Sequence, residues 1–340
     1  SFEGEAEALY RANLWLRTAS RVLARLGKFY AASFSELHKR ASQLEWEKYL
    51  RPGAPVRLNV TCHKSRLYHS GAVAERVLAG IAGRLGAPSP ERATEVPAEA
   101  PAQLIVVRLV RDRCTISLDS SGELLHRSGY RLAGAKAPLR ETLAAALLLA
   151  SGWDTSAPLL DPFCGSGTIA IEAALLALGL PPGRNRDFAF TRWPDFDPAV
   201  WQRALGEGTP TDAARRVLIQ ASDRDAGAVR MAVENAARSG VGEAIEFSQR
   251  AFSAIQPLPG PGWVVTNPPF GVRVSQNKDL RDLYAQLGKA LRRACPGWQI
   301  AALSADPRLT SHMGIATKSV LSTRSGGLNL QLRSGRVPIG

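Results

Sequence analysis

The sequence lacks the features that mark secreted, membrane-spanning or metal-binding chains. It has four cysteines in 340 residues, and no two of them have the CxxC spacing of a zinc or redox site. Its longest apolar runs, such as residues 143–150, are much shorter than the ~18 residues that span a membrane. No basic and then apolar leader opens the chain. We therefore expect a cytoplasmic protein without disulfides and without a metal site.

Acidic residues are also few relative to basic ones. The chain has 43 Lys and Arg against 30 Asp and Glu, a formal net charge of +13. Residues 1–137 hold 21 basic and 13 acidic side chains, and residues 51–84 hold six basic side chains and one acid. This excess favours a polyanionic partner over a solvated surface without one. The residues that we expect to contact this partner are Arg57, Lys64, Arg66 and Arg76.

The N-terminal part has the pattern of a small α+β region. Residues 5–16 predict a helix, and residues 16–30 fit a strand or a helix equally well. Ser33 and Glu36 form an S-x-x-E capping box, which predicts a helix over 33–50. Further on, the pattern predicts a strand over 55–63, a helix over 72–85, a proline-rich surface loop over 86–102 and two strands joined at 111–113.

From Ala137 onward, strands alternate with helices. Buried strands are predicted to end at Asp161, Asp223 and Thr266, with a further strand near 298–304, and helices follow each of the first three. Residues 180–215 interrupt this alternation and look inserted. The pattern predicts a parallel, doubly wound sheet that binds its ligands at the carboxyl ends of the strands.

A glycine-rich turn follows the first of these strands. Glycines between a buried strand and a helix let a ligand approach the backbone closely. Gly165, Gly167 and Ala170 also satisfy the G-x-G-x-x-A pattern of dinucleotide-binding enzymes, but the next suitable acid, Asp223, lies much further on than that pattern requires. The candidate cofactor-binding residues are Asp161, Pro162, Phe163, Gly165, Ser166, Gly167, Thr168 and Asp223.

The two acids suit a charged nucleoside such as S-adenosylmethionine. Asp223 has the acceptors to bind ribose hydroxyls, and Asp161 would stand near the cationic sulfonium and amino groups. The alternative for each acid is a structural role as the N-cap of the following helix. S-adenosylmethionine is therefore the predicted cofactor, and a nicotinamide dinucleotide is the alternative.

The stretch NPPF at 267–270 ends the third strand with two prolines, which make it stiff and extended. The Asn267 side-chain oxygen and the Pro268 carbonyl would accept the two hydrogens of a planar exocyclic amine, and Phe270 would stack on its ring. We predict that Asn267, Pro268, Pro269 and Phe270 form the catalytic motif. Guanine N2, adenine N6 and a protein glutamine amide all present such an amine.

These motifs resemble those of class I S-adenosylmethionine-dependent methyltransferases that act on exocyclic nitrogens. The motifs are DPFCGSGT at 161–168, ASDRD at 221–225 and TNPPFG at 266–271. Residues 55–77 resemble an RNA-binding THUMP domain, and residues 2–23 resemble the ferredoxin-like domain that precedes it. Residues 126–153 are similar to the join between THUMP and transferase in bacterial large-subunit ribosomal RNA guanine-N2 methyltransferases.

The resemblance implies a Rossmann-like class I methyltransferase domain over 131–340, preceded by a ferredoxin-like domain over 1–54 and a THUMP domain over 55–130. It implies methylation of a guanine N2 in ribosomal or transfer RNA. The alternatives are an adenine-N6 nucleic-acid enzyme, a protein glutamine methyltransferase and a non-catalytic RNA-binding assembly factor. Ala251 stands where many members carry an acid for the adenine amine, and the start at Ser1 leads us to expect an upstream segment or an atypical first domain.

Overall fold

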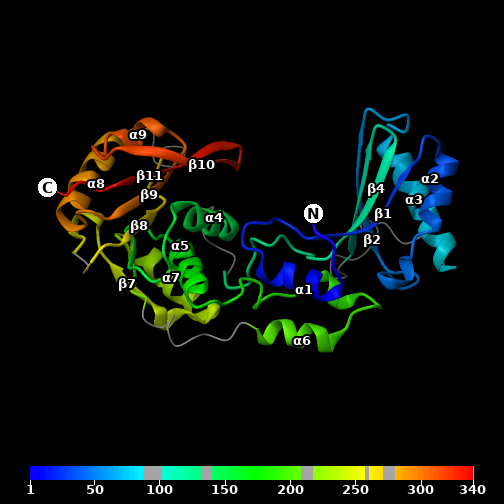
Figure 1. The fold of residues 1–340 in the computed structure, drawn as a ribbon, viewed down its shortest axis with the longest axis horizontal. Helices are drawn as coiled ribbons and strands as arrows, with labels where there is room; N and C mark the ends of the chain where they lie inside the picture. Colours follow the sequence, from blue (N-terminus) through cyan, green and yellow to red (C-terminus); the bar gives the residue numbers. More distant parts are fainter. Residues whose placement is uncertain (87–101, 132–138, 208–216, 257–259, 271–279, 340) are drawn as a thin grey trace. The chain divides into compact units, whose positions relative to one another are not determined.

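The structure, a computed structural model, describes residues 1–86, 102–131, 139–207, 217–256, 260–270 and 280–339. Most of the proline-rich loop predicted over 86–102 therefore lies outside the described residues. Close packing divides the chain into two compact units (Figure 1). The first unit holds 1–15, 19–125 and 186–206, and the second holds 16–18, 126–185 and 207–340. No helix in the described ranges is both long enough and apolar enough to span a membrane.

The first unit contains four strands and their helices. Residues 23–30, which the pattern leaves undecided, form a strand because they pair antiparallel with the strand that ends at Asp119. The elements are α1 (Ala6–Trp15), β1 (Leu23–Tyr30), α2 (Phe34–Ser42), η1 (Trp46–Lys48), β2 (Val56–His63), α3 (Ser70–Leu85), β3 (Gln103–Val110), β4 (Arg113–Asp119), η2 (Ala189–Arg192) and α6 (Pro198–Gly206).

The helix predicted over 33–50 is shorter than expected. Ser33 does cap it by accepting a hydrogen bond from the Glu36 amide, but α2 ends at Ser42. The Trp46 indole is fully buried, and its Nε1 donates to the Ala41 carbonyl at 2.7 Å. Burial of this large side chain turns the backbone out of the helix, so the prediction was wrong for the second half of the segment.

The four strands form one sheet in the order β1-β4-β3-β2. Strands β2 and β3 are parallel, and the other two pairs are antiparallel. Helices α2 and α3 cover one face (Figure 1), where residues such as Val77 and Ile81 share a core with Ile105 and Ile116. The side chains of the other face alternate with these buried ones and are largely accessible.

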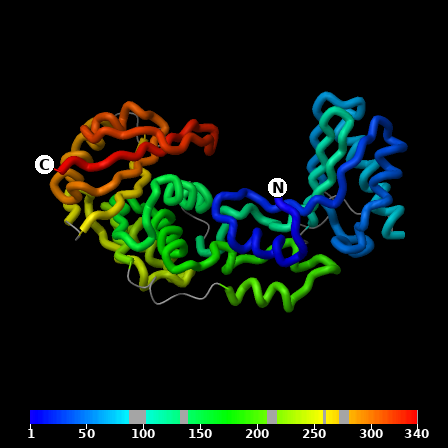
Figure 2. The backbone as a smooth tube through the Cα atoms, in the orientation of Figure 1, coloured from blue at the N-terminus to red at the C-terminus, as the bar shows by residue number. Residues whose placement is uncertain are grey.

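Part of the predicted insertion at 180–215 belongs to the first unit. Phe190 stacks on Tyr10 of α1 with ring centroids 4.5 Å apart, and the Tyr10 hydroxyl accepts a hydrogen bond from the Asp197 amide at 3.0 Å. Helix α6 packs against α1, as Figure 2 shows for the green and dark blue segments. The inserted residues thus complete the small core around α1.

The second unit is a doubly wound sheet with helices on both faces. Its elements are α4 (Glu141–Ser151), β5 (Leu159–Asp161), α5 (Thr168–Ala177), β6 (Ile219–Asp223), α7 (Ala226–Ser239), η4 (Gly242–Ala244), β7 (Ile245–Gln249), η5 (Phe252–Ala254), β8 (Trp263–Thr266), α8 (Leu280–Ala294), β9 (Gln299–Ser304), α9 (Pro307–Ser311), β10 (Thr317–Ser325) and β11 (Leu328–Arg336).

The strand order is β10-β11-β9-β8-β5-β6-β7. Strands β9, β8, β5, β6 and β7 are parallel, as the alternation predicts, and the antiparallel hairpin of β10 and β11 was not predicted. Successive residues of the central strands point to opposite faces: Val265 packs with α4 and α5, whereas Val264 packs with α8. Burial on both faces explains the continuous apolar runs.

Gly288 allows α8 to pack closely against the chain that follows α9. A Cβ atom added at Gly288 would lie 1.8 Å from the Met313 carbonyl oxygen, which is backbone and cannot rotate away. We expect Gly288→Ala to destabilise the second unit by at least ~2 kcal/mol, because the two segments must separate. Differential scanning calorimetry of the full chain measures the effect.

The control is Gly83→Ala in α3, where a Cβ atom meets nothing within 4 Å. Alanine is the better helix former, so this variant should be neutral or more stable by about 0.5 kcal/mol. Equal stability of the two variants would contradict the close packing of α8.

Candidate functional site

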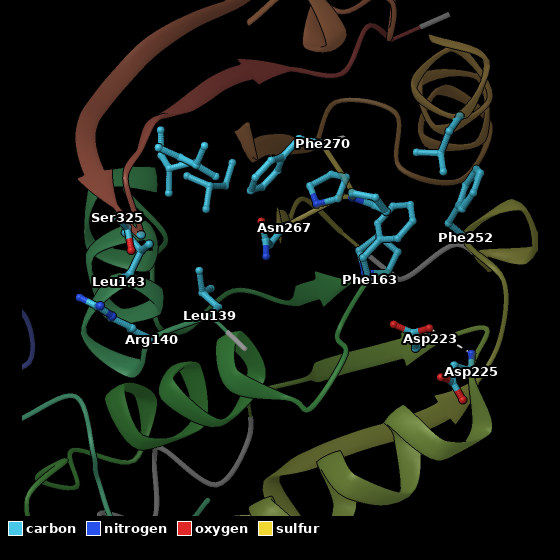
Figure 3. A pocket seen from close by; sticks show the side chains of 18 of the residues that line it. Leu139, Arg140, Leu143, Phe163, Asp223, Asp225, Phe252, Asn267, Phe270 and Ser325 are labelled. Atoms are coloured by element: carbon cyan, nitrogen blue, oxygen red, sulfur yellow. Dashed lines mark hydrogen bonds between the residues drawn. The ribbon is translucent and has the colours of Figure 1, made fainter. Parts of the chain in front are cut away.

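A pocket of about 680 Å³ opens at the carboxyl ends of β5, β6 and β8 (Figure 3). Its volume suits a cofactor together with part of a substrate. The residues from the sequence prediction that line it are Pro162, Phe163, Asp223, Asn267, Pro268, Pro269 and Phe270. Motifs more than 100 residues apart in the chain therefore meet in one wall, as expected where strand order reverses in an open α/β sheet.

Asp223 holds the glycine-rich turn in place from the end of β6. One carboxylate oxygen accepts from the Gly165 amide at 3.1 Å, and the other accepts from the Asp225 amide at 3.0 Å. A carboxylate has further lone pairs beyond these two bonds. Asp223 therefore lines the pocket with lone pairs that can still accept hydrogen bonds. The N-cap of helix α7 is Asp225 and not Asp223.

Asp161 lies beneath the pocket and is not part of its wall. Its side chain is buried, and Oδ1 accepts from the Thr266 hydroxyl at 2.7 Å and from the Phe163 amide at 3.2 Å. Oδ2 is buried without a hydrogen-bond partner among the described residues. Burial raises the pKa of Asp161 to about 7, although both hydrogen bonds oppose the shift.

The rest of the glycine-rich turn is shaped by packing. Gly165 and Gly167 have φ of +51° and +84°, which side chains other than glycine rarely adopt. A Cβ at Gly167 would meet Ala232 at 2.9 Å, but at Gly165 it would meet open space. Thr168 is buried and accepts from Arg131 at 2.7 Å, and the Ser166 carbonyl accepts from a side chain of α7. None of these four residues lines the pocket.

The NPPF segment leaves an acceptor free at the centre of the pocket. Asn267 Oδ1 is buried and has no hydrogen-bond partner among the described residues. A buried amide oxygen without a partner is unfavourable, so it is suited to a ligand that donates. Phe270 is partly buried and lines the same wall. Figure 3 shows Asn267 and Phe270 between the aspartates on one side and Arg140 and Leu143 on the other.

Several lining residues escaped the sequence prediction. Arg140 is exposed at the N-terminus of α4, and its guanidinium suits a carboxylate or a phosphate. The hairpin of β10 and β11 contributes Ser325, Gly326, Leu328 and Leu330; it was not predicted, although its two-glycine turn at 326–327 is a hairpin signal. Phe252, whose ring lies 5.2 Å from that of Phe163, had no distinguishing pattern.

The four residues predicted to contact RNA all lie in the first unit. Arg57 is on the accessible face of the sheet in β2, and Lys64 and Arg66 follow in the turn after it. Arg76 is exposed on α3, which packs on the opposite face. The structure therefore separates Arg76, on the helical side of the sheet, from Arg57 on the accessible face.

Comparison with known proteins identifies the architecture. The RMKL-like methyltransferase domain matches residues 128–333, more than half of the chain. The chain belongs to the RMKL-like methyltransferase family. The RlmL ferredoxin-like domain matches residues 1–23 and the THUMP domain matches residues 31–119. The predicted fold class and family are confirmed, and the protein is an S-adenosylmethionine-dependent RNA methyltransferase.

Relatives match almost the whole chain. A putative RNA methyltransferase of Synechocystis sp. is 35% identical over 333 residues, which cover 96% of this chain and 86% of that protein. A ribosomal RNA large subunit methyltransferase K/L of Syntrophotalea carbinolica is 36% identical over 344 residues and 98% of this chain, but this is 48% of that protein. The chain thus spans about half the length of the K/L relative.

Two solved structures have the same fold throughout. A predicted N6-adenine-specific DNA methylase from Listeria monocytogenes has a TM-score of 0.83 and 33% identity, covering 97% of this chain and 86% of that chain. A putative methyltransferase complexed with SAH has a TM-score of 0.82 and 29% identity, covering 98% and 88% of the two chains.

The pocket fits the methyl donor of this family. In its wall, Asp223 offers free acceptors and Phe163 and Phe252 supply apolar surface. A Cβ at Gly165, whose amide donates to Asp223, would meet open space. S-adenosylmethionine supplies an electrophilic methyl group when it is bound. We expect Asp223 and the Gly165 turn to hold it.

The raised pKa of Asp161 predicts a pH dependence of stability. A carboxyl group that is easier to protonate in the folded chain stabilises the fold fully below about pH 4, and this contribution disappears as pH rises through about 7. We expect the melting temperature to fall between pH 5 and 8, and to fall less steeply in Asp161→Asn, which keeps the acceptor for Thr266.

Asp154→Asn is the matched control. Hydrogen bonds from the Ser156 amide and hydroxyl lower the pKa of the exposed Asp154, so it stays ionised throughout this range. Its pH slope should equal that of the wild type. An Asp161→Asn slope as steep as the wild-type slope would show that Asp161 is ionised when buried.

Proposed function

We propose that this protein transfers the methyl group of S-adenosylmethionine to the exocyclic N2 of a guanine in ribosomal RNA. The observation that carries the proposal is the unpartnered, buried Asn267 Oδ1 in the wall of the pocket that Asp223 also lines. The K/L relative is named a ribosomal RNA large subunit methyltransferase, which supports the choice of polymer. Transfer RNA is the alternative substrate.

Asn267 and Pro268 would activate the target by position and not by strong basicity. The lone pair of an exocyclic amine is delocalised into the ring, so the nitrogen is a poor nucleophile. Two fixed acceptors, Asn267 Oδ1 and the Pro268 carbonyl, would bind both amine hydrogens and turn the lone pair towards the methyl group. As the nitrogen gains the methyl group it becomes acidic, and its proton passes to water.

Phe270 would hold the ring that carries the amine. Its partly buried side chain lies beside Asn267 (Figure 3), so a planar base would stack on one and hydrogen-bond to the other. A base must leave its helix to reach this wall, at a cost of a few kcal/mol. A loop, a bulge or a partly assembled RNA should therefore be a better substrate than a mature duplex.

The choice of guanine rests on family resemblance alone, because Asn267 and Phe270 would serve adenine N6 equally well. The Listeria structure is named an N6-adenine-specific DNA methylase, so adenine is the strongest competing target. The basic first unit and its THUMP match favour RNA over DNA and over a protein glutamine. The complete NPPF wall argues against a purely non-catalytic role.

Alanine substitutions of Asp223 and Asn267 should affect different quantities: the first cofactor affinity, and the second the rate of methyl transfer. Asp223→Ala removes the acceptors at the turn, so we expect S-adenosylmethionine binding to weaken about tenfold or more. Asn267→Ala should leave cofactor affinity within about threefold and reduce kcat about a hundredfold, as loss of a transition-state contact does. Isothermal calorimetry and single-turnover methylation measure the two effects.

Asp154→Ala is the control for loss of a turn-capping aspartate, because Asp154 caps a turn outside the pocket wall. It should change neither quantity. An equal loss of cofactor binding in the Asp223 and Asn267 variants would mean that both residues hold the cofactor and that the base-binding role of Asn267 is wrong.

The methylated product identifies the base directly. Incubation of the wild type with labelled S-adenosylmethionine and protein-free ribosomal RNA, followed by digestion to nucleosides and mass spectrometry, should yield N2-methylguanosine. Total transfer RNA and total protein from the same cells are parallel substrates. A product of N6-methyladenosine would refute guanine as the target base but would agree with the proposed roles of Asn267 and Phe270. Label found only in protein would refute RNA as the substrate.

A further inference from the structure

One face of the β1-β4-β3-β2 sheet is not covered by any of the described helices. In β2 the residues Arg57, Asn59, Thr61 and His63 are exposed, and the residues between them are more buried. On β3 the exposed side chains Arg108 and Val110 alternate with the buried Val107 and Leu109. Because side chains of a strand alternate between faces, these exposed residues share one surface.

Strand register places basic residues of different strands on this surface. Lys28 of β1 lies opposite Thr115 of β4, and Thr115 lies opposite Arg108 of β3. Arg108 in turn pairs with Thr61 of β2. Residues directly opposite in a sheet lie on the same face, so Lys28 and Arg108 flank the small Thr115 two strands apart.

A second cross-strand row lies at the edge of the same face. Tyr30 is opposite Arg113, Arg113 is opposite Val110, and Val110 pairs with His63. The Tyr30 and Val110 side chains are 51% and 47% exposed. An exposed aromatic ring beside an arginine is the combination that stacks on an unpaired base while the cation meets the backbone.

The charged residues that the strands place on this face are all cations, and in the turn between β3 and β4 Asp112 accepts a hydrogen bond from the Tyr30 hydroxyl at 3.5 Å. Lys28, Arg108 and Arg113 have no ion-pair partner within the described ranges of the chain. The single acid in the four strands, Asp119, is buried at the far end of β4 and pairs with Arg21. Uncompensated cations on an open sheet are unfavourable to one another, and an anionic partner relieves their repulsion.

We propose that this sheet face, defined by Lys28, Tyr30, Arg57, Arg108 and Arg113, is the surface on which the first unit binds its RNA substrate. The inference rests on the proposed function and adds the place of contact. Lys28, Arg108 and Arg113 meet phosphates, and Tyr30 stacks on an unpaired base. Of the residues expected from sequence, Arg57 belongs to this surface, whereas Arg76 lies on the helical side.

The test compares two double variants of the full chain that remove the same charge. Lys28→Ala with Arg108→Ala changes the sheet face, and Lys39→Ala with Arg40→Ala changes exposed residues of α2 on the other side. Affinity for protein-free large-subunit ribosomal RNA is measured from 50 to 300 mM salt. Each lost phosphate contact lowers the slope of log affinity against log salt by roughly 0.7 to 0.9.

We expect the sheet variant to lose about 1.4 to 1.8 from this slope and about tenfold or more in affinity at 100 mM salt, and to raise KM for RNA. Cofactor binding by calorimetry should be unchanged, and unchanged thermal unfolding of the full chain confirms that the first unit is folded. The α2 variant should match the wild type. Tyr30→Ala should lose about tenfold in affinity, and Tyr30→Phe should retain it because the ring remains.

Two results distinguish this inference from the proposed function. If the wild type methylates ribosomal RNA and the sheet variant has unchanged slope and KM, or if the α2 variant loses as much as the sheet variant, the assigned surface is wrong. If the wild type and the sheet variant differ in RNA affinity as expected but no RNA is methylated, the surface stands and the proposed reaction is wrong.

Discussion

The buried hydrogen bond from the Thr266 hydroxyl to Asp161 joins the two halves of the pocket. Thr266 is the last residue of β8 and the neighbour of Asn267, and Asp161 is the last residue of β5 and the start of the glycine-rich turn. The same carboxylate oxygen accepts from the Phe163 amide. In a buried site such a bond is strong, and breaking it would leave the buried Thr266 hydroxyl without its acceptor. The positions of the cofactor turn and the NPPF segment are therefore coupled.

A second polar cluster supports the pocket from below, at helix α5. The buried Glu172 accepts from the Tyr130 hydroxyl at 3.2 Å, and Arg17 lies 3.8 Å from its other oxygen. Burial raises the pKa of Glu172 to about 7, while the cation Arg17 opposes the shift. Arg131 donates to Thr168 at the first turn of α5. These groups do not line the pocket, so their contribution is to fix the helix that follows the glycine-rich turn.

The two compact units divide the chemistry of the protein by the kind of surface each presents. In the second unit, the important polar atoms are the acceptors of the pocket wall: Asp223, Asn267 and the Pro268 carbonyl. In the first unit, the important groups are exposed donors on a sheet, led by Lys28 and Arg108. Acceptors in a pocket suit a neutral amine and a sulfonium cation, whereas exposed cations suit a polyphosphate chain.

Much of the fold and half of the site could be read from the sequence, because they depend on local signals. Strands that end in Asp161, Asp223 and Thr266 are continuous apolar runs, and α7 stops at Gly240, whose φ of +71° favours glycine. The convergence of these strand ends follows from parallel topology alone. The helix predicted over 33–50 failed because burial of Trp46, a tertiary contact, overrode the local capping signal.

The sequence by itself determined the family, the cofactor type and the candidate catalytic motif NPPF, because each is signalled by short motifs of consecutive residues. Only the tertiary structure decided that Asp161 lies under the pocket and not in it, and that Arg140 and the hairpin of β10 and β11 complete the wall. It also decided that Lys28 and Arg108, 80 positions apart, face the same side while Arg76 does not. Counting charges along the sequence does not show which basic residues share a sheet face, because strand register and sheet face are set by pairing between distant segments.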